Sequence, residues 1–209
     1  KKLPYPTDPD TINKKNIIVF VLESFSKNYL MAGHKHKANT PFIDSLMQKS
    51  VVCNNAFANG VMSINGLNSI IGGIPPIAFQ TLTNSPYQNT IKARTGLILE
   101  SKGYSTHFFF GSNDDHYGFK RLTRQLGISN YYGKKEFGND SLDDGMWGIY
   151  DMPFFEYAAG VLKKEKLPFF SVIFNLSSHF PYTVPEPYKS ALPAGPLNSS
   201  QSVSYVDKS

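Results

Sequence analysis

The chain of 209 residues has little cysteine and no long apolar run. Its one cysteine, Cys53, cannot form an internal disulfide, so packing and hydrogen bonds must hold the fold. No stretch approaches the roughly 20 apolar residues that a transmembrane helix needs, and the first residues do not have the pattern of a signal peptide. A composition of 41% hydrophobic and 14% aromatic residues instead predicts one globular domain with a sizeable core.

Concentrated positive charge is also missing. The net charge of +5 favours anionic partners, such as nucleic acid, a phosphorylated small molecule or an acidic membrane surface. The basic residues are scattered, however, and the pairs at 14–15, 134–135 and 163–164 are typical of solvated faces. We therefore expect no nucleic-acid partner.

The most informative segment that is present is the apolar run Ile17–Leu22, which leads directly into Glu23 and Ser24. Such a run predicts a strand of a parallel sheet, buried on both faces. Ligands of open α/β sheets collect beyond the carboxyl ends of the strands, which makes Glu23 a candidate catalytic or metal-binding carboxylate. The alternative is a solvated strand end at which Glu23 points into water.

Strands alternate with helices along the rest of the chain, which predicts an α/β fold with a mainly parallel sheet flanked by helices. The capping and periodicity signals predict helices at 41–50, 63–71, 89–103 and 117–126, a longer helix that begins at Asp151, and strands at 106–110 and 169–174.

Two of these helices carry specific expectations. Thr40 before Pro41 predicts an N-cap hydroxyl followed by proline at the first helical position. The buried stripe of that helix is expected to be Phe42, Ile43, Leu46 and Met47. Asp151 is expected to cap its helix, with lysines 163, 164 and 166 in the last turn.

Ser63 is the candidate nucleophile. It follows a glycine-containing turn at 59–62 and enters a helix, so its hydroxyl would lie where free backbone N–H groups and the helix dipole favour an anion. That position suits attack on a phosphorus or sulfur ester. The alternative is a plain N-cap serine, because serine is a preferred cap in any helix.

Two histidines follow predicted strands. His179 comes after the strand at 169–174, where an imidazole could face a substrate, although a lone histidine is more often structural. The run Asp114-Asp115-His116 follows the strand at 106–110, and its side chains could bind a cation. A carboxylate beside a histidine is nevertheless a motif of low specificity.

Several segments together are more specific than any one of them. In order, they are 16–24, Thr40-Pro41-Phe42-Ile43-Asp44-Ser45-Leu46, Phe57-Ala58-Asn59-Gly60 with Ser63 and Gly66, Trp147-Gly148-Ile149-Tyr150-Asp151, and Phe174-Asn175-Leu176-Ser177-Ser178-His179-Phe180-Pro181. In this order and spacing the chain resembles the lipoteichoic acid synthase and phosphoglycerol transferase branch of the alkaline phosphatase/sulfatase superfamily. The resemblance covers residues 16–209, and its tail at 201–207 looks like the segment that opens the family's next helix.

The resemblance implies an extracytoplasmic catalytic domain that N-terminal membrane helices, absent from this chain, would anchor in the cell membrane. It implies transfer of a phosphorylated alcohol, such as phosphoglycerol, from an anionic phospholipid to a glycan or glycolipid acceptor, or phosphodiester hydrolysis. Glu23 matches a metal ligand and Ser63 matches the nucleophile, which also binds the metal. Trp147 and His179 match positions that line the head-group pocket. The metal implied is divalent, Mn²⁺ first, with Mg²⁺ or Zn²⁺ as alternatives.

On chemical grounds we expect the pocket to select an anionic head group that carries hydroxyl or amine functions. The indole N–H of Trp147 and the imidazole of His179 would hold it, since together they can bind a small polyol phosphate. Residues 1–15 are expected to be an extension or linker, and 16–209 the N-terminal portion of a C-terminally truncated domain.

The chain also departs from the family pattern. Met62 stands where the family often has a basic residue, and the remaining metal ligands, an Asp-His pair, would lie beyond Ser209. By resemblance, 114–116 is a variable segment at the pocket rim and not that pair.

The formylglycine sulfatase motif fits neither Cys53 nor Ser63, which argues against sulfatase activity. If the metal site is incomplete, the alternative function is a non-catalytic lipid- or glycan-binding domain.

Overall fold

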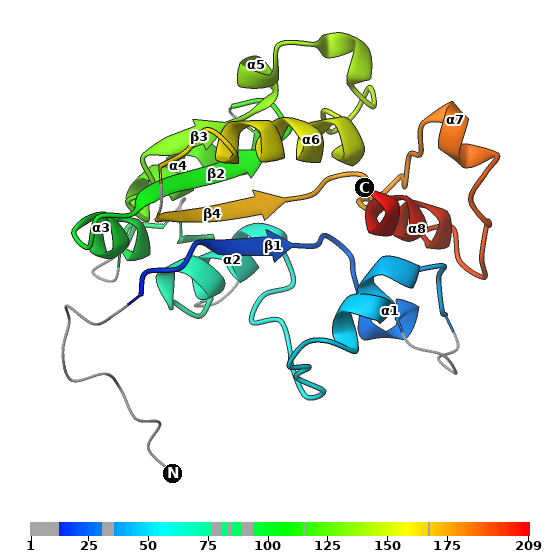
Figure 1. Ribbon diagram of the computed structural model, residues 1–209, viewed down its shortest axis with the longest axis horizontal. Coiled ribbons are helices and arrows are strands. Elements are labelled where there is room, and N and C mark those ends of the chain that lie inside the picture. The colour runs from blue at the N-terminus through cyan, green and yellow to red at the C-terminus, as the bar shows by residue number, and fades with distance from the viewer. Residues whose placement is uncertain are drawn as a thin grey trace.

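The computed structural model describes residues 13–30, 36–76, 81–82, 85–88, 94–114, 116–166 and 168–209. One parallel sheet forms the centre, with the strand order β1-β4-β2-β3 (Figure 1). The strands are β1 (Ile17–Val21), β2 (Ser105–Phe110), β3 (Asn130–Tyr132) and β4 (Phe169–Phe174). The predicted α/β class with a parallel sheet is therefore confirmed, and parallel pairing requires the crossover connections that the helices provide.

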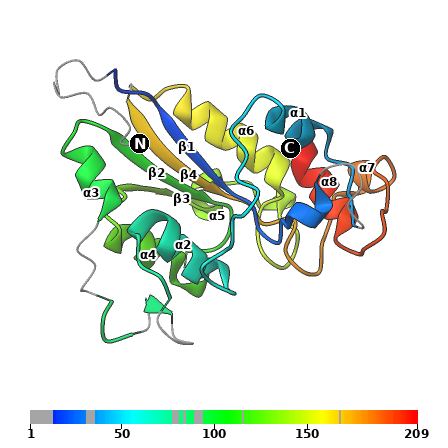
Figure 2. The same cartoon turned by 90° about the horizontal axis from the view of Figure 1, so that it is seen from below.

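The helices lie on both sides of the sheet and beyond its carboxyl end (Figures 1 and 2). No helix among the described residues is long and apolar enough to cross a membrane. The α-helices are α1 (Pro41–Met47), α2 (Ser63–Gly72), α3 (Thr95–Glu100), α4 (Phe119–Gln125), α5 (Lys134–Phe137), α6 (Asp151–Leu162), α7 (Glu186–Lys189) and α8 (Ser200–Lys208), and the 3₁₀ turns are η2 (Lys27–Tyr29), η4 (His116–Gly118) and η5 (Asp140–Leu142).

The two faces of the sheet carry separate hydrophobic cores because successive side chains of a strand point to opposite faces. Phe108 and Phe110 of β2 pack on the same side as α2 and α4. Phe109, between them, packs with Phe154 and Ala158 of α6 on the other side. In Figure 1, α6 lies above the sheet and α2 below it. The result is a helix–sheet–helix sandwich.

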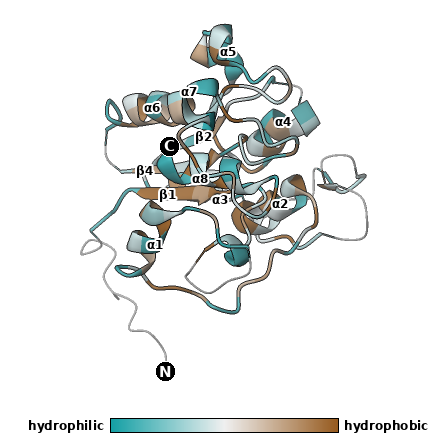
Figure 3. Ribbon diagram, turned by 90° about the vertical axis from the view of Figure 1, so that its right-hand side faces the viewer, coloured by the Kyte–Doolittle hydropathy of each residue, from teal (hydrophilic) through white to brown (hydrophobic). Residues whose placement is uncertain are grey.

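The prediction that the first strand is buried on both faces is wrong in this structure. β4 is buried along its whole length, but β1 lies at the edge of the sheet, where Ile18 is 47% exposed and Phe20 54% exposed. Figure 3 colours β1 as hydrophobic, and its Val19 and Val21 are only partly buried against the neighbouring core. Apolar composition therefore identified the strand correctly but not its neighbours.

The expected buried stripe of α1 is also wrong, since Phe42 and Leu46 are at least half exposed. Thr40 is the N-cap residue, but its side chain makes no capping hydrogen bond. Instead, the carboxylate of Asp207 on α8 accepts hydrogen bonds from the backbone N–H groups of Phe42 and Ile43, at 3.0 and 2.8 Å. A carboxylate from another helix thus supplies the cap.

Two further helix predictions need correction. Tyr150, and not Asp151, is the N-cap of α6, and this helix ends at Leu162, before the three lysines. The third predicted helix is shorter than expected: α3 spans Thr95–Glu100, and the proposed start at Asn89 lies outside the described residues.

The short strand β3 was not predicted because three residues give too little alternation to recognise. Its Tyr131 and Tyr132 stack on Phe108 and Phe109 of β2, with ring centroids 5.9 and 4.6 Å apart. At the C-terminal end, the helix expected to open near residue 201 is present as α8.

Candidate active site

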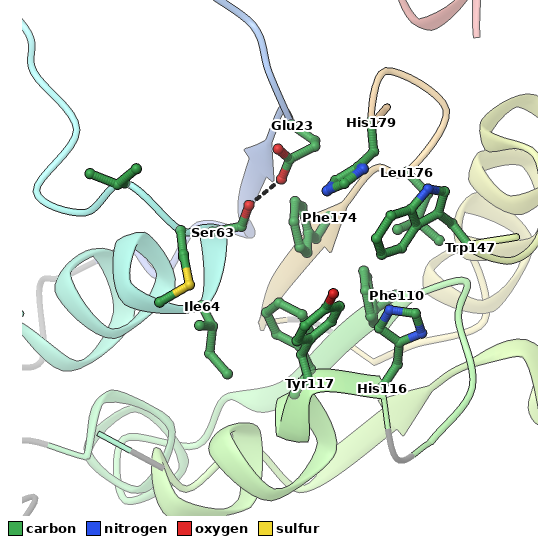
Figure 4. A pocket seen from close by; sticks show the side chains of 13 residues that line it. Glu23, Ser63, Ile64, Phe110, His116, Tyr117, Trp147, Phe174, Leu176 and His179 are labelled. Carbon is green, nitrogen blue, oxygen red and sulfur yellow. Dashed lines mark hydrogen bonds between the residues drawn. The ribbon is translucent and has the colours of Figure 1, made fainter. Parts of the chain in front are cut away.

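The carboxyl ends of β1, β2 and β4 open into one pocket of about 240 Å³ (Figure 4). This is the position at which parallel α/β sheets bind ligands. All four site residues singled out from the sequence line this pocket: Glu23, Ser63, Trp147 and His179. Between Ser63 and Trp147 the pocket is completed by His116 and Tyr117, of which Tyr117 was not singled out.

Ser63 and Glu23 are in direct contact. The Ser63 hydroxyl donates a short hydrogen bond to Glu23 Oε2, and the Ser24 hydroxyl donates one to Glu23 Oε1 at 3.1 Å. Ser63 is the first residue of α2, whose N-cap is Met62. The plain N-cap alternative for Ser63 therefore does not hold, because its side chain binds a carboxylate and not the backbone of its own helix.

The turn before Ser63 depends on a glycine. A Cβ on Gly60 would lie 2.7 Å from the Asn65 Cβ, closer than side-chain atoms pack. Without a side chain at residue 60, the turn can lie against the first turn of α2. This close approach helps to place Ser63 opposite Glu23.

Glu23 is held from the neighbouring strand. Its backbone N–H donates to Asn175 Oδ1 at 2.5 Å, and its carbonyl accepts from the Ser178 hydroxyl at 2.6 Å. Both partners lie in the loop that leaves β4. Because this loop holds the backbone of Glu23, the side-chain carboxylate extends into the pocket from a backbone that is fixed in place.

A buried carboxylate organises that loop. Asp151 accepts from the backbone N–H groups of Leu176 and Ser177, at 2.8 and 3.0 Å, and from Asn175 Nδ2 at 3.1 Å. Complete burial raises the pKa of Asp151, and the donated hydrogen bonds oppose that shift. The capping pattern predicts Asp151 only as a helix cap, and its place in the Trp147–Asp151 motif is the sequence signal of a further role.

The loop carrying Trp147 is fixed at the end of β2. Asp144 Oδ1 accepts from the backbone N–H groups of Met146, Trp147 and Gly148, at 2.8, 2.6 and 3.0 Å. A Cβ on Gly148, whose φ is +150°, would lie 2.2 Å from the Gly111 carbonyl oxygen. Only glycine allows this approach, so the Trp-Gly pair sets the position of the indole.

The expected use of the indole N–H is wrong. Trp147 Nε1 donates to the Phe180 carbonyl at 2.6 Å, and His179 Nδ1 lies 2.9 Å from the same oxygen. The indole N–H is therefore already engaged and cannot also bind a head group. What Trp147 presents to the pocket is its ring, with the His179 ring centroid only 3.9 Å away.

His116 and Tyr117 extend this aromatic wall. Their ring centroids lie 5.2 and 6.2 Å from that of Trp147, and the Tyr117 ring is within 20° of parallel to the indole. Burial, together with the nearby His179, lowers the pKa of His116. The segment after β2 thus contributes rings to the pocket.

Comparison with known proteins identifies the family of this chain. A family model described as sulfatase matches residues 15–208. The chain belongs to the sulfatase family. The resemblance seen in the sequence is confirmed at that level.

The sulfatase-family relatives include lipoteichoic acid synthases. Lipoteichoic acid synthase 2 of Bacillus subtilis is 25% identical over 205 residues, 93% of this chain and 31% of that protein. Among solved structures, a protein of the alkaline phosphatase superfamily from Vibrio parahaemolyticus is 25% identical with a TM-score of 0.77, over 93% of this chain and 48% of that one.

The lipoteichoic acid synthase LtaP of Listeria monocytogenes is 23% identical with a TM-score of 0.79, over 93% of this chain and 50% of that one, and supports the fold. The chain thus spans about a third of the length of the Bacillus subtilis synthase and about half of the length of these two solved structures.

The two metal donors predicted from the sequence, Glu23 and Ser63, bring their side-chain oxygens together in the pocket. They are of the type that hard divalent cations prefer, but within the described ranges no group of three His, Cys, Asp or Glu side chains gathers. Asp114 instead forms an ion pair with Lys120 at 2.5 Å, and Asp115 lies outside the described residues.

One solved protein of the same fold contains a metal. The periplasmic domain of EcEptC from Escherichia coli was solved as a complex with zinc and matches with 15% identity and a TM-score of 0.66, over 96% of this chain and 58% of that one. At this identity the likeness shows the fold alone.

Proposed function

We propose that this domain transfers a phosphorylated alcohol from a phospholipid to a glycan or glycolipid acceptor, or hydrolyses the phosphodiester, through a phosphorylated Ser63. The observation that carries the proposal is the hydrogen bond from the Ser63 hydroxyl to Glu23 at the floor of the pocket. A serine at the start of a helix and paired with a carboxylate has the arrangement of an activated nucleophile.

The proposed chemistry has two displacements. Ser63 Oγ attacks phosphorus while its proton leaves through the hydrogen bond to Glu23, and the phosphorus bond to the diacylglycerol oxygen breaks. That oxygen takes up a proton from solvent. An acceptor hydroxyl, or water, then attacks the phosphorus of this Ser63 phosphodiester and loses its proton to solvent, while Ser63 Oγ leaves and recovers its proton from Glu23. The Asn175 and Ser178 contacts keep Glu23 in place through both steps.

A divalent cation fits the oxygen donors of Glu23 and Ser63, and Mn²⁺ is the first candidate, ahead of Mg²⁺ and Zn²⁺. When bound, it would lower the pKa of the hydroxyl and neutralise charge on the phosphoryl oxygens. Further ligands would come from outside the described residues.

We further propose that the domain works outside the cytoplasm at the cell membrane, with an anionic phospholipid head group as donor. One comparison supports this: lipoteichoic acid synthase 2 of Bacillus subtilis is 25% identical over 93% of this chain. The net charge of +5 adds a diffuse attraction to an acidic membrane surface, which salt should weaken.

The test is Ser63→Ala in the natural full-length protein. We expect turnover of a fluorescent phospholipid to disappear while the fold remains, because Ser63 is not the N-cap of α2. Mass spectrometry after acid quenching should find the phosphorylated alcohol of the donor lipid attached to Ser63 in the protein without the substitution. Ser63→Thr is the matched control, since it keeps a hydroxyl and should keep partial activity. Full activity in Ser63→Ala would refute the proposal.

The second candidate is a non-catalytic domain that binds lipid or glycan. It is favoured by one observation, that the described residues supply only two metal donors at the pocket. The same assay separates the two, because a binding domain would hold the phospholipid without turnover in any variant.

A further inference from the structure

The pocket that contains Ser63 is unusual in its charge. Among the described residues that line it there is one carboxylate, Glu23, and no lysine or arginine. A neighbouring pocket, which shares Tyr117 as a wall, carries instead Lys120, Arg121 and Arg124. Fixed positive charge is therefore present nearby but kept out of the cavity next to the proposed nucleophile.

Aromatic rings form one wall of the pocket. Trp147 lies in the middle of this wall, in contact with His179, His116 and Tyr117, and Figure 4 shows these side chains gathered on one side of the pocket. A ring face carries partial negative charge and attracts cations. Tryptophan and tyrosine provide the strongest faces for this purpose.

Some hydrogen-bonding groups of this wall already have partners within the protein. The Phe180 carbonyl accepts a hydrogen bond from the indole N–H of Trp147 and lies at hydrogen-bonding distance from His179 Nδ1. When His179 is neutral and carries its proton on Nδ1, its other ring nitrogen is an acceptor. A cation suits the ring faces of this wall better than a neutral polyol does, and a primary ammonium can in addition donate a hydrogen bond to that nitrogen.

Tyr117 is placed in the wall by its backbone. Its φ is +48° and that of Gly118 is +77°, so two consecutive residues adopt left-handed conformations. A tyrosine in this region is uncommon and is maintained only when the surroundings require it. The side chain is 64% exposed, so its position is not explained by burial in the core.

We propose that this pocket selects a phosphodiester whose head group carries an ammonium or quaternary ammonium ion, held against the rings of Trp147 and Tyr117. The inference rests on the proposed function and specifies its donor: the transferred alcohol is an amino alcohol and not glycerol. The cavity of about 240 Å³ is large enough for such a head group. Its phosphate lies toward Ser63 and its cation toward the rings.

The test uses the emission of Trp147, which is the only tryptophan of the chain. The chain is titrated with glycerophosphocholine, glycerophosphoethanolamine and glycerophosphoglycerol, which share one phosphodiester and differ in the head group. We expect the two cationic compounds to bind about 2- to 30-fold more tightly than the glycerol compound, the range that one cation–π contact supplies. The ratio of the choline to the ethanolamine compound distinguishes a quaternary from a primary ammonium.

Two variants at one position test the ring directly. Tyr117→Ala should remove most of the preference for the cationic compounds, and Tyr117→Phe should keep it, because the ring remains and only the hydroxyl is lost. Both changes affect an exposed side chain, so folding is preserved. Equal or tighter binding of the glycerol compound, no response to the choline compound, or equal losses in both variants would overturn the proposal.

Failure of this proposal and failure of the proposed function have different signatures. Ser63→Ala should abolish turnover in the full-length protein but leave the head-group preference in the titration. A lost preference with intact Ser63-dependent turnover refutes only the cationic head group. A clear preference together with active Ser63→Ala refutes only the catalytic role of Ser63.

Discussion

Glu23 and Asn175 lie at the carboxyl ends of two adjacent strands, and the backbone N–H of Glu23 donates to Asn175 Oδ1 at 2.5 Å. The amide of Asn175 also donates to Asp151 and to the Ser178 hydroxyl. One buried side chain therefore joins the candidate metal-binding carboxylate to the start of α6. The site is supported by a polar network that holds the backbone of Glu23.

The first prediction concerns this network. Asn175→Ala should lower the free energy of unfolding by about 1–3 kcal/mol, because it leaves buried partners without hydrogen bonds. Urea denaturation measures this. Lys164→Ala, in a turn after α6, is the control and should have little effect. An unchanged midpoint in Asn175→Ala would show that the network contributes nothing to the fold.

The second prediction concerns metal. The chain by itself should bind Mn²⁺ weakly or not at all, because Glu23 and Ser63 supply two donors where first-row sites usually take three or four protein ligands. Isothermal titration calorimetry measures the affinity. A submicromolar site would mean that Asp114, Asp115 or His116 completes it, which Asp114→Asn and His116→Ala would then reveal.

The third prediction concerns His179. In the full-length protein, His179→Ala should reduce phospholipid turnover by about 10- to 100-fold but have much less effect on a small activated phosphodiester, which needs little positioning. Comparison of kcat/KM on both substrates is the measurement. Equal losses would place His179 in the chemical step, and no loss on either would make it structural.

The fourth prediction is a pH dependence of stability. Burial lowers the pKa of His107, and nearby Glu165 only partly opposes this. The folded chain therefore prefers neutral His107, and the stability it contributes is present above pH about 6.5 and is lost as the pH falls through its lower folded-state pKa.

Comparison with a variant isolates that residue from other titrating groups. His107→Gln should flatten the acid side of the stability profile by at most about 1.4 kcal/mol per pH unit. His116, whose pKa is also lowered, should retain its own contribution. Parallel profiles for the two proteins, measured by urea denaturation between neutral and mildly acidic pH, would contradict the prediction.

The sequence by itself determined the strands β1, β2 and β4, the helix that begins at Ser63, and the parallel α/β class. Apolar runs and helix-start signals are local properties that predict where an element lies, although tertiary contacts decide which groups cap α1 and α6. The sequence also indicated Glu23 and His179, because each follows a predicted strand at the edge where parallel sheets bind ligands. The turn that enters a helix indicated Ser63, and only the family resemblance indicated Trp147. Their catalytic and binding roles remain predictions.

Only the tertiary structure decided how those side chains are used. Strand order left β1 at an edge, so an apolar run that reads as buried is half exposed. The indole N–H of Trp147 donates to the Phe180 carbonyl. The Asp151 carboxylate accepts hydrogen bonds from the loop after β4 and does not cap its own helix. Each outcome depends on a partner far along the chain, and the spacing of residues in a sequence does not specify which distant group a hydrogen bond will find.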